Sequence, residues 1–499
     1  MRSIAVRGVV VGLLLLGVLS PAGAGNHELV IGRAVSTTSM DPGFLREAAT
    51  IVDNVFDTLV LRDKDMSLAP GLAESWRTVN ATTWEFKLRR GVKFHNGEPF
   101  TARAVKFTLD RVLDPAAKAP TISYIRTIQG VDVVDDYTVH IVTSAPDPLV
   151  PTRMSRYPAY IVPPEYVAKV GPEEFGRKPV GTGPYKLVSF VKDEQITLAA
   201  NDDYWRGAPA IKRVVWRPIP EATARLAAML AGEVHLIENL PVDQVPLVER
   251  GGAAEVERVR NGGLIVYLGL KTNVSPLDKA KVRQAISLAI DRRAIVESIL
   301  RGYASLTGTQ VGPYDFGYVK TPSPAFDPAR ARQLLAEAGH PTGFDIDMQV
   351  TRRYLSGAEV GQALTQQLKN VGIRVNLQVP EWSVYIQQVP AGKQAPVYML
   401  GWGSTQTLDA DAAVYAIFRS GEPYSTVSIP RMDQLLDEAR RTIDPDARRR
   451  LYRDIQELAA REVPVVTLYQ EDALYGKRKN VRFKGRGDAR IVVYDIRVE

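Results

Sequence analysis

V-Y-M-L-G-W-G-S-T-Q-T-L-D-A-D-A-A-V-Y-A-I-F, residues 397–418, passes from an apolar strand to a helical pattern through one polar loop. Val397 to Leu400 has the length and composition of a buried strand, which ends at Gly401-Trp402-Gly403. Hydroxyl and amide residues follow, and helical spacing resumes near two acids, Asp409 and Asp411. Open α/β sheets bind ligands at the loops that follow their strands. The stretch therefore predicts an α/β fold with a candidate binding loop.

Two interpretations of this loop stay open from the residues alone. Trp402 lies between two glycines, so its neighbours do not cover the indole, which can line a binding cleft or fill a core. Asp409 and Asp411 can bind a cationic group or cap the helix that follows.

The first 24 residues have the pattern of a secretory signal peptide. Arg2 and Arg7 form a basic start, Val9 to Leu19 is apolar, and Ala22-Gly23-Ala24 is a small-x-small cleavage site. The alternative is an uncleaved membrane anchor, but the apolar run is short for a bilayer span. We therefore expect cleavage after Ala24 and export.

Composition narrows the class of protein. The chain has 499 residues, 45% hydrophobic and 24% charged, which suits two or three globular domains. It has no cysteine, which excludes disulfides, thiol nucleophiles and a lipoprotein anchor. We therefore predict a periplasmic protein that is not a lipoprotein. The formal charge of +7 comes from interspersed charges, so we expect no nucleic-acid partner.

Strand and helix patterns divide the chain into a first lobe, an inserted α+β unit and a second lobe. The predicted limits are 25–67, 180–263 and 476–499 for lobe I, 68–179 for the inserted unit, and 264–475 for lobe II. Two strand crossings, near Leu264 to Lys271 and near Val466 to Leu474, would join the lobes. Lobes joined in this way can rotate about their connections.

A family resemblance covers nearly the whole chain after residue 24. Its motifs occur in the family's order: G-L-A-E-S-W at Gly71–Trp76, W-E-F-K-L-R-R-G-V-K-F-H-N-G-E-P-F at Trp84–Phe100, G-T-G-P-Y at Gly181–Tyr185, A-A-M-L-A-G-E-V at Ala227–Val234, V-R-Q-A-I-S-L-A-I-D-R at Val282–Arg292, A-R-Q-L-L-A-E-A-G at Ala331–Gly339, and Gly401-Trp402. The chain resembles the extracytoplasmic solute-binding proteins of ABC importers, peptide/nickel-type family 5.

The resemblance implies both a fold and a function. The fold would be a two-lobed periplasmic-binding-protein fold, a type II Venus flytrap, with the inserted unit as an extra subdomain. The function would be to hold a small peptide or peptide-like solute between the lobes and deliver it to a permease and ATPase at the inner membrane. We expect a monomer.

The resemblance also implies ligand-binding residues. Relatives that bind dipeptides hold the peptide carboxylate with an Arg followed two residues later by a Tyr, and Arg352 and Tyr354 stand at that place. A guanidinium offers a planar fork to a carboxylate. The adjacent Arg353 leaves the assignment ambiguous by one residue, and a structural Arg that bridges the lobes is the alternative.

The loop after Trp402 departs from the dipeptide-binding pattern. Those relatives carry an Asp three residues after this tryptophan, where the chain has Thr405. The Ser-Thr-rich loop that ends in Asp-Ala-Asp resembles the glutathione-binding relatives instead, with one residue more. Asp409 would then meet an ammonium group or cap the helix.

The predicted ligand-binding residues therefore come from three loops. Thr38 is included because the hydroxyl-rich loop after the first strand is either a wall of the cleft or a set of caps. The full set is Arg352, Tyr354, Trp402, Ser404, Thr405, Asp409 and Thr38.

The competing class is a secreted hydrolase. The sequence has no Gly-x-Ser-x-Gly, no His-Glu-x-x-His and no phosphate-binding loop, and its five histidines are scattered. We predict no enzyme, no catalytic residues, no cofactor and no metal ligands. An oligosaccharide or chelated nickel is the alternative ligand.

Overall fold

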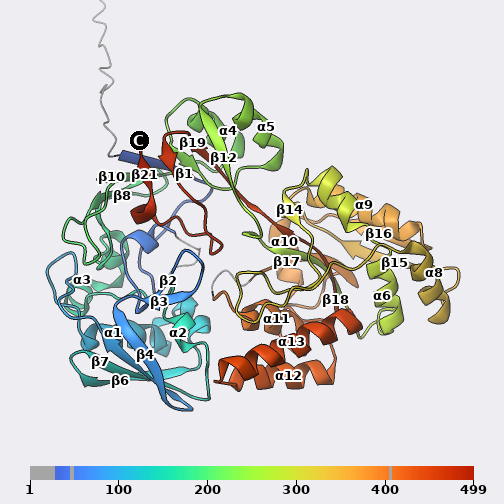
Figure 1. Ribbon diagram of the computed structural model, residues 1–499, viewed down its shortest axis with the longest axis horizontal. Helices are drawn as coiled ribbons and strands as arrows, with labels where there is room; N and C mark the ends of the chain where they lie inside the picture. The colour runs from blue at the N-terminus through green and yellow to red at the C-terminus, as the bar shows by residue number, and fades with distance from the viewer. Residues whose placement is uncertain (1–27, 45–49, 404–406) are drawn as a thin grey trace, which may run out of the picture.

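The computed structural model describes residues 28–44, 50–403 and 407–499 (Figure 1). The predicted signal peptide, Ser404 and Thr405 lie outside these residues. The strand predicted at the start of residues 397–418 forms as β17 (Val397–Trp402), and the predicted helix forms as α11 (Ala410–Phe418).

A seven-stranded sheet forms the core of the first lobe, in the order β12-β19-β11-β1-β10-β9-β8. Its strands are β1 (Glu28–Arg33), β8 (Tyr185–Val191), β9 (Gln195–Ala200), β10 (Arg213–Pro218), β11 (Leu236–Ile237), β12 (Ala254–Val259) and β19 (Ala473–Arg478). β1 runs parallel to β10 and β11, and the other pairs are antiparallel. Helices α4 (Ala222–Leu230) and α5 (Val245–Arg250) pack their apolar residues on one face. A short pair, β20 (Val481–Arg482) and β21 (Arg497–Val498), ends this part of the chain.

The inserted unit has its own four-stranded sheet and its own hydrophobic core, at the lower left of Figure 1. The sheet order is β4-β5-β7-β6, from β4 (Ala73–Asn80), β5 (Thr83–Leu88), β6 (Ile128–Asp135) and β7 (Thr138–Thr143). Around it lie β2 (Val60–Arg62), β3 (Leu68–Pro70), α1 (Ala102–Leu113), α2 (Val150–Arg153) and α3 (Pro164–Arg177). The apolar side chains of α1 at Val105, Leu109 and Val112 are buried against this sheet, as their helical spacing predicts.

A six-stranded sheet forms the core of the second lobe, at the right of Figure 1, in the order β14-β18-β13-β17-β15-β16. Besides β17, its strands are β13 (Ile265–Leu270), β14 (Ala304–Ser305), β15 (Phe344–Gln349), β16 (Ile373–Gln378) and β18 (Val465–Glu471). One face packs against α6 (Ala280–Leu288), α8 (Pro328–Glu337) and α9 (Gly357–Lys369), and the short α7 (Arg292–Ala294) follows α6. The other face packs against α10 (Trp382–Gln388), α11, α12 (Pro430–Arg441) and α13 (Pro445–Glu462).

The chain crosses between the sheets twice, from β12 to β13 and from β18 to β19, as the sequence predicts. The two crossings lie against each other. The Asp472 carboxylate accepts hydrogen bonds from Asn261 N (2.9 Å) and Arg258 Nε (2.6 Å), and Gly263 N donates to Glu471 O (2.9 Å). Because β19 starts at Ala473, the limit predicted at residue 475 falls inside a strand of the first sheet. The predicted lobe limits otherwise remain a proposal.

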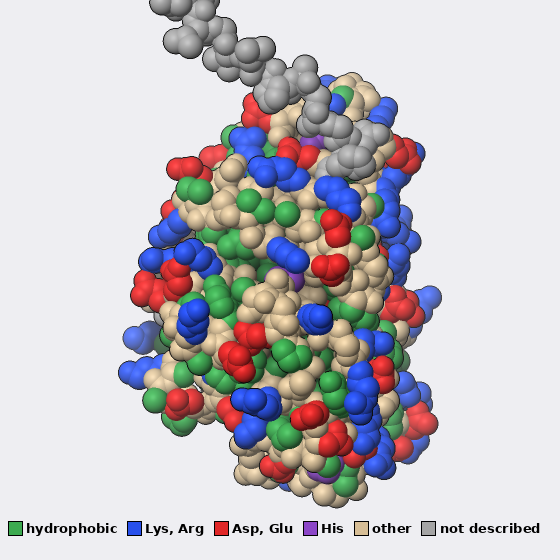
Figure 2. Space-filling view, turned by 90° about the vertical axis from the view of Figure 1, so that its left-hand side faces the viewer, with side chains coloured by type: hydrophobic (Ala, Val, Ile, Leu, Met, Phe, Trp, Pro, Cys, Tyr) green, Lys and Arg blue, Asp and Glu red, His purple; other side chains and the backbone are tan. Residues whose placement is uncertain are grey.

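Charges of both signs lie on the face of the molecule drawn in Figure 2. Basic and acidic side chains lie among one another there. Within residues 28–44, 50–403 and 407–499, no helix combines the length and apolar character that crossing a bilayer requires.

Candidate ligand-binding site

Three strands of the second sheet end at the edge where the chain crosses to the first lobe. β15 and β17 run parallel, and β13 lies antiparallel to both β17 and β18, so β15, β17 and β18 all point the same way. Gln349, Trp402 and Glu471 therefore end their strands at one edge of the sheet. In open α/β sheets this carboxyl edge is where ligands bind. Two of the predicted site loops begin here.

Arg352 lies in the turn after β15, and its side chain is exposed. Among the described residues, its guanidinium forms no hydrogen bond or ion pair. The neighbouring Arg353 has a different environment, because its guanidinium lies 5.9 Å from the centre of the Trp382 ring. The two arginines between which the sequence could not choose therefore differ, and Arg352 is the one with its donors available.

Tyr354 is buried, with 5% of its surface exposed. Its ring covers Gly401, where an added Cβ would lie only 2.6 Å from the ring, so glycine is required at that position of β17. Burial raises the pKa of Tyr354 to about 12, and the backbone of Gly401 only partly opposes this rise. Tyr354 thus packs the loop after β15 against β17 at this edge of the sheet.

Trp402 is half-buried at the end of β17. Its Nε1 donates to Ala412 O of α11 (2.8 Å), and its ring lies 5.0 Å from the ring of Tyr424. Trp402 therefore contributes to the packing of α11 and also keeps part of its surface exposed, so the two interpretations of the sequence are compatible.

Asp409 has the capping role that the sequence left open. Its side chain accepts a hydrogen bond from Asp411 N (2.9 Å) at the start of α11. It also forms a bidentate ion pair with Arg448 of α13, with N–O distances of 2.6 and 2.7 Å. Only 3% of the surface of Asp409 is exposed. Its role toward a ligand remains a prediction, but these contacts already occupy both carboxylate oxygens.

Thr38 belongs to the first lobe. It is exposed in the loop after β1, whose neighbours β10 and β11 are parallel to it, so the loop leaves the carboxyl edge of the first sheet. Close by in sequence, the buried Thr37 accepts a hydrogen bond from Arg33 Nη1 (3.1 Å). The place of Thr38 in the ligand site stays a prediction.

Two charged residues at the junction of the lobes were missed in the sequence. Glu471, at the end of β18, accepts a hydrogen bond from Leu355 N (2.8 Å), and desolvation raises the pKa of its carboxyl to about 7. Arg62, at the end of β2, donates to Thr407 O in the loop after Trp402. The sequence feature that could have indicated Glu471 is its place as an acid at the end of an apolar strand.

A small cavity lies between the lobes beside these loops. It is lined by residues of both crossings, of the loop after β17 and of the C-terminal segment, including Asn261, Gly263, Gly403, Leu408, Gln470 and Gly487. The Tyr314 ring lies so close to Gly487 that a Cβ there would come within 2.6 Å of it. The two lobes therefore meet at this cavity.

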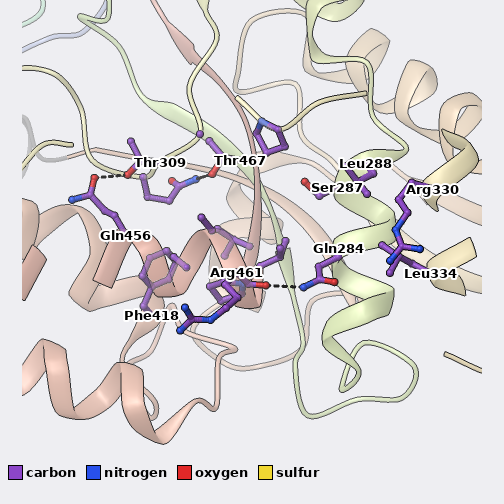
Figure 3. Close-up of a pocket in the computed structure, with 18 residues that line it drawn as sticks. Gln284, Ser287, Leu288, Thr309, Arg330, Leu334, Phe418, Gln456, Arg461 and Thr467 are labelled. Atoms are coloured by element: carbon purple, nitrogen blue, oxygen red, sulfur yellow. Dashed lines mark hydrogen bonds between the residues drawn. The ribbon is translucent and has the colours of Figure 1, made fainter. Parts of the chain in front are cut away.

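A cavity of about 340 Å³ lies elsewhere (Figure 3). It is lined by Gln284 of α6, Arg461 of α13 and the first residues of β18, Val465 and Thr467. This is the amino end of β18, opposite the edge that carries Arg352 and Trp402, and none of the predicted site residues lines it. This cavity is therefore separate from the loops that carry the predicted site residues.

No group of three or more His, Cys, Asp or Glu side chains in the described part of the chain is arranged to hold a metal ion.

Two lobes joined by paired crossings define a two-lobed solute-binding protein. At their junction lie a half-exposed tryptophan and an arginine that has no partner within the described part of the chain. The sequence model of the bacterial extracellular solute-binding proteins, family 5 Middle, matches residues 67–425. The chain belongs to this family, whose members bind solutes outside the cytoplasm for ABC importers.

Individual relatives agree with this. The glutathione-binding protein GsiB of Escherichia coli O1:K1 is 29% identical over 490 residues, which cover 94% of this chain and 95% of GsiB. HbpA2 from Haemophilus parasuis superposes with a TM-score of 0.85 at 25% identity, over 95% of this chain and 100% of HbpA2. The periplasmic binding protein DppA from Helicobacter pylori, in complex with peptide STSA, has a TM-score of 0.76 at 26% identity, over 95% and 98%. These matches confirm the two-lobed α/β fold predicted from the sequence.

Proposed function

We propose that this protein binds a small peptide or peptide-like solute through its carboxylate and delivers it to the permease of an ABC importer. The observation that carries the proposal is Arg352, which is exposed at the carboxyl edge without a partner among the described residues. A guanidinium in this position is suited to bind a carboxylate with two parallel hydrogen bonds. The peptide bound to DppA and the glutathione named for GsiB both support a ligand that carries a carboxylate.

The remaining predicted residues complete the proposed site. Tyr354 and Trp402 supply aromatic surface beneath and beside the ligand. Thr38 supplies a hydroxyl from the first lobe, and Ser404 and Thr405 supply hydroxyls from the loop after Trp402. We assign no direct contact to Asp409, because Arg448 holds its carboxylate.

We also propose where the protein resides and in what form. The mature chain starts after Ala24, resides in the periplasm without a lipid anchor, acts as a monomer and catalyses no reaction. Intact mass and size-exclusion measurements on protein from a native periplasmic extract test this. A mass that retains residues 1–24, or a lipid adduct, would contradict it.

Calorimetry with Arg352→Ala tests the proposed site. The first step is to identify bound peptides by mass spectrometry of native protein, and the second is to titrate them into refolded, ligand-free protein. Arg352→Ala should weaken binding by about tenfold to a hundredfold, the usual range for a charge-assisted hydrogen bond. Arg353→Ala is the matched control and should change affinity by less than about threefold, because its guanidinium lies over Trp382. Equal effects of both variants would contradict the assignment to Arg352.

A further inference from the structure

The acids near the carboxyl edge of the second sheet differ in one respect, which is whether a cation already neutralises them. Asp409 pairs with Arg448 at 2.6 Å, and Asp411 pairs with Arg440 at 2.9 Å. Asp472, at the crossing itself, pairs with Arg258. These three carboxylates are satisfied within the protein.

Glu471 lies at the same edge without an ion pair among the described residues. Its Oε1 accepts the hydrogen bond from Leu355 N (2.8 Å), which fixes the direction of the side chain. Its Oε2 has no hydrogen-bond partner among the described residues and is not among the fully enclosed polar atoms. A carboxylate with one oxygen held and one oxygen available is prepared to accept a further donor.

The backbone around Glu471 is held firmly. Glu471 N donates to Leu264 O (2.9 Å), and Gly263 N donates to Glu471 O (2.9 Å). An added Cβ at Gly263 would lie 2.8 Å from Glu471, so the first crossing runs directly beside this residue. The side chain is therefore presented from a rigid position, which favours selective recognition.

The loop bonded to Glu471 also touches the other lobe. Leu355 packs against the apolar cluster of the first lobe that contains Leu240 and Leu474. The same loop carries Arg352, three residues earlier in the chain. Glu471 therefore lies at the junction of the lobes, at the end of β18, and it is hydrogen-bonded to the loop that carries the proposed carboxylate-binding residue.

We propose that Glu471 is the acidic residue that receives the cationic amino group of the ligand. It would take the place of the acid that the chain lacks at Thr405. This rests on the proposed function, and it defines the ligand class as zwitterionic peptides with a free amino group and a free carboxylate. The chain then provides Arg352 for one end of the ligand and Glu471 for the other.

The ionisation of Glu471 supports this assignment. Desolvation raises the pKa of the Glu471 carboxyl to about 7, and the Leu355 N–H and the charge of Arg353 only partly oppose it. The other titratable groups that face it are Tyr354 and Tyr469, whose own pKa values are raised by burial. Near neutral pH part of the protein therefore carries a proton on Glu471, and an arriving ammonium group would displace that proton.

Glu471→Gln tests the proposal, because glutamine keeps an acceptor for Leu355 N and removes the charge. The probe is a pooled library of di- to pentapeptides, each with a free and with an acetylated amino terminus, and bound peptides are read by mass spectrometry. The wild type should retain free-amine peptides at least about tenfold better than their acetylated forms. Glu471→Gln should lose this preference. The matched control is Glu457→Gln, an exposed acid of α13, which should keep it.

Calorimetry of one retained peptide in two buffers of different ionisation enthalpy gives a second readout. The wild type should release protons on binding near pH 7, and Glu471→Gln should not. A wild type that retains free and acetylated peptides equally, or a variant that keeps the preference and the proton release, overturns the role of Glu471 alone. A wild type that retains no peptide of either form overturns the proposed function and this inference with it.

Discussion

At the scale of single residues, Asp409 and Arg448 form a buried ion pair. Arg448 also donates to Tyr452 Oη (2.7 Å) and to Ala439 O (3.1 Å), so its guanidinium joins α11, α12 and α13. Breaking such a pair leaves an uncompensated buried charge, which costs about 3–5 kcal/mol. Arg448→Met should therefore lower stability by about that amount in urea unfolding, and Asp409→Asn should behave similarly.

The double variant Asp409→Leu with Arg448→Met is the control for this prediction. It removes both charges and should recover most of the lost stability. If Asp409→Asn instead left unfolding unchanged and abolished peptide binding, Asp409 would be a ligand residue and the capping interpretation would be wrong.

Single residues also show how much of the candidate site could be predicted from the sequence. Arg352 and Trp402 could be placed because each follows a recognisable strand, and strand ends share an edge in this class of fold. The partner of Asp409 lies 39 residues away and the partner of Glu471 lies 116 residues away. Non-local pairs of this kind leave no local pattern. The sequence therefore predicted that the loops after β15 and β17 leave the sheet at one edge, but it could not predict which of the nearby acids are already neutralised.

At the scale of elements, His95 joins the inserted unit to the first lobe. Its Nε2–H donates to Gly183 O (2.9 Å), and its Nδ1 accepts from Gly181 N (3.3 Å) in the G-T-G-P-Y segment that precedes β8. The bond that Nδ1 accepts requires the neutral imidazole with its proton on Nε2. Burial lowers the pKa of His95 to about 4.

This pKa shift predicts a loss of stability in mild acid. The unfolded chain protonates His95 below about pH 6.5, whereas the folded chain resists protonation down to about pH 4. The contribution of His95 is therefore complete above pH 6.5 and falls by about 2 kcal/mol between pH 7 and pH 5. His95→Gln, which keeps a donor for Gly183 O, should show a smaller loss over the same interval in urea unfolding. An identical pH dependence in both proteins would contradict the prediction.

At the scale of the whole molecule, the lobes are joined at one side by the paired crossings and touch elsewhere through small contacts. Arg62 of β2 donates to Thr407 O across the junction, and its Nη1 donates to Met66 O (2.9 Å). Burial lowers the pKa of Arg62 to about 10, so the guanidinium remains charged at neutral pH. A cation held by carbonyl oxygens at the junction should favour the arrangement in which the lobes touch.

Removing this contact should therefore open the ligand-free protein. Arg62→Met keeps an apolar side chain of similar reach and removes all donors, so the population with the lobes in contact should fall. The apparent affinity for a retained peptide falls in proportion to that population, by about fivefold for one hydrogen bond. Small-angle scattering should show a larger radius of gyration without ligand and the wild-type value with saturating peptide. Arg103→Met, at an exposed position of α1, is the control and should leave both quantities unchanged. An unchanged radius and affinity in Arg62→Met would mean that the hinge strands alone set the angle between the lobes.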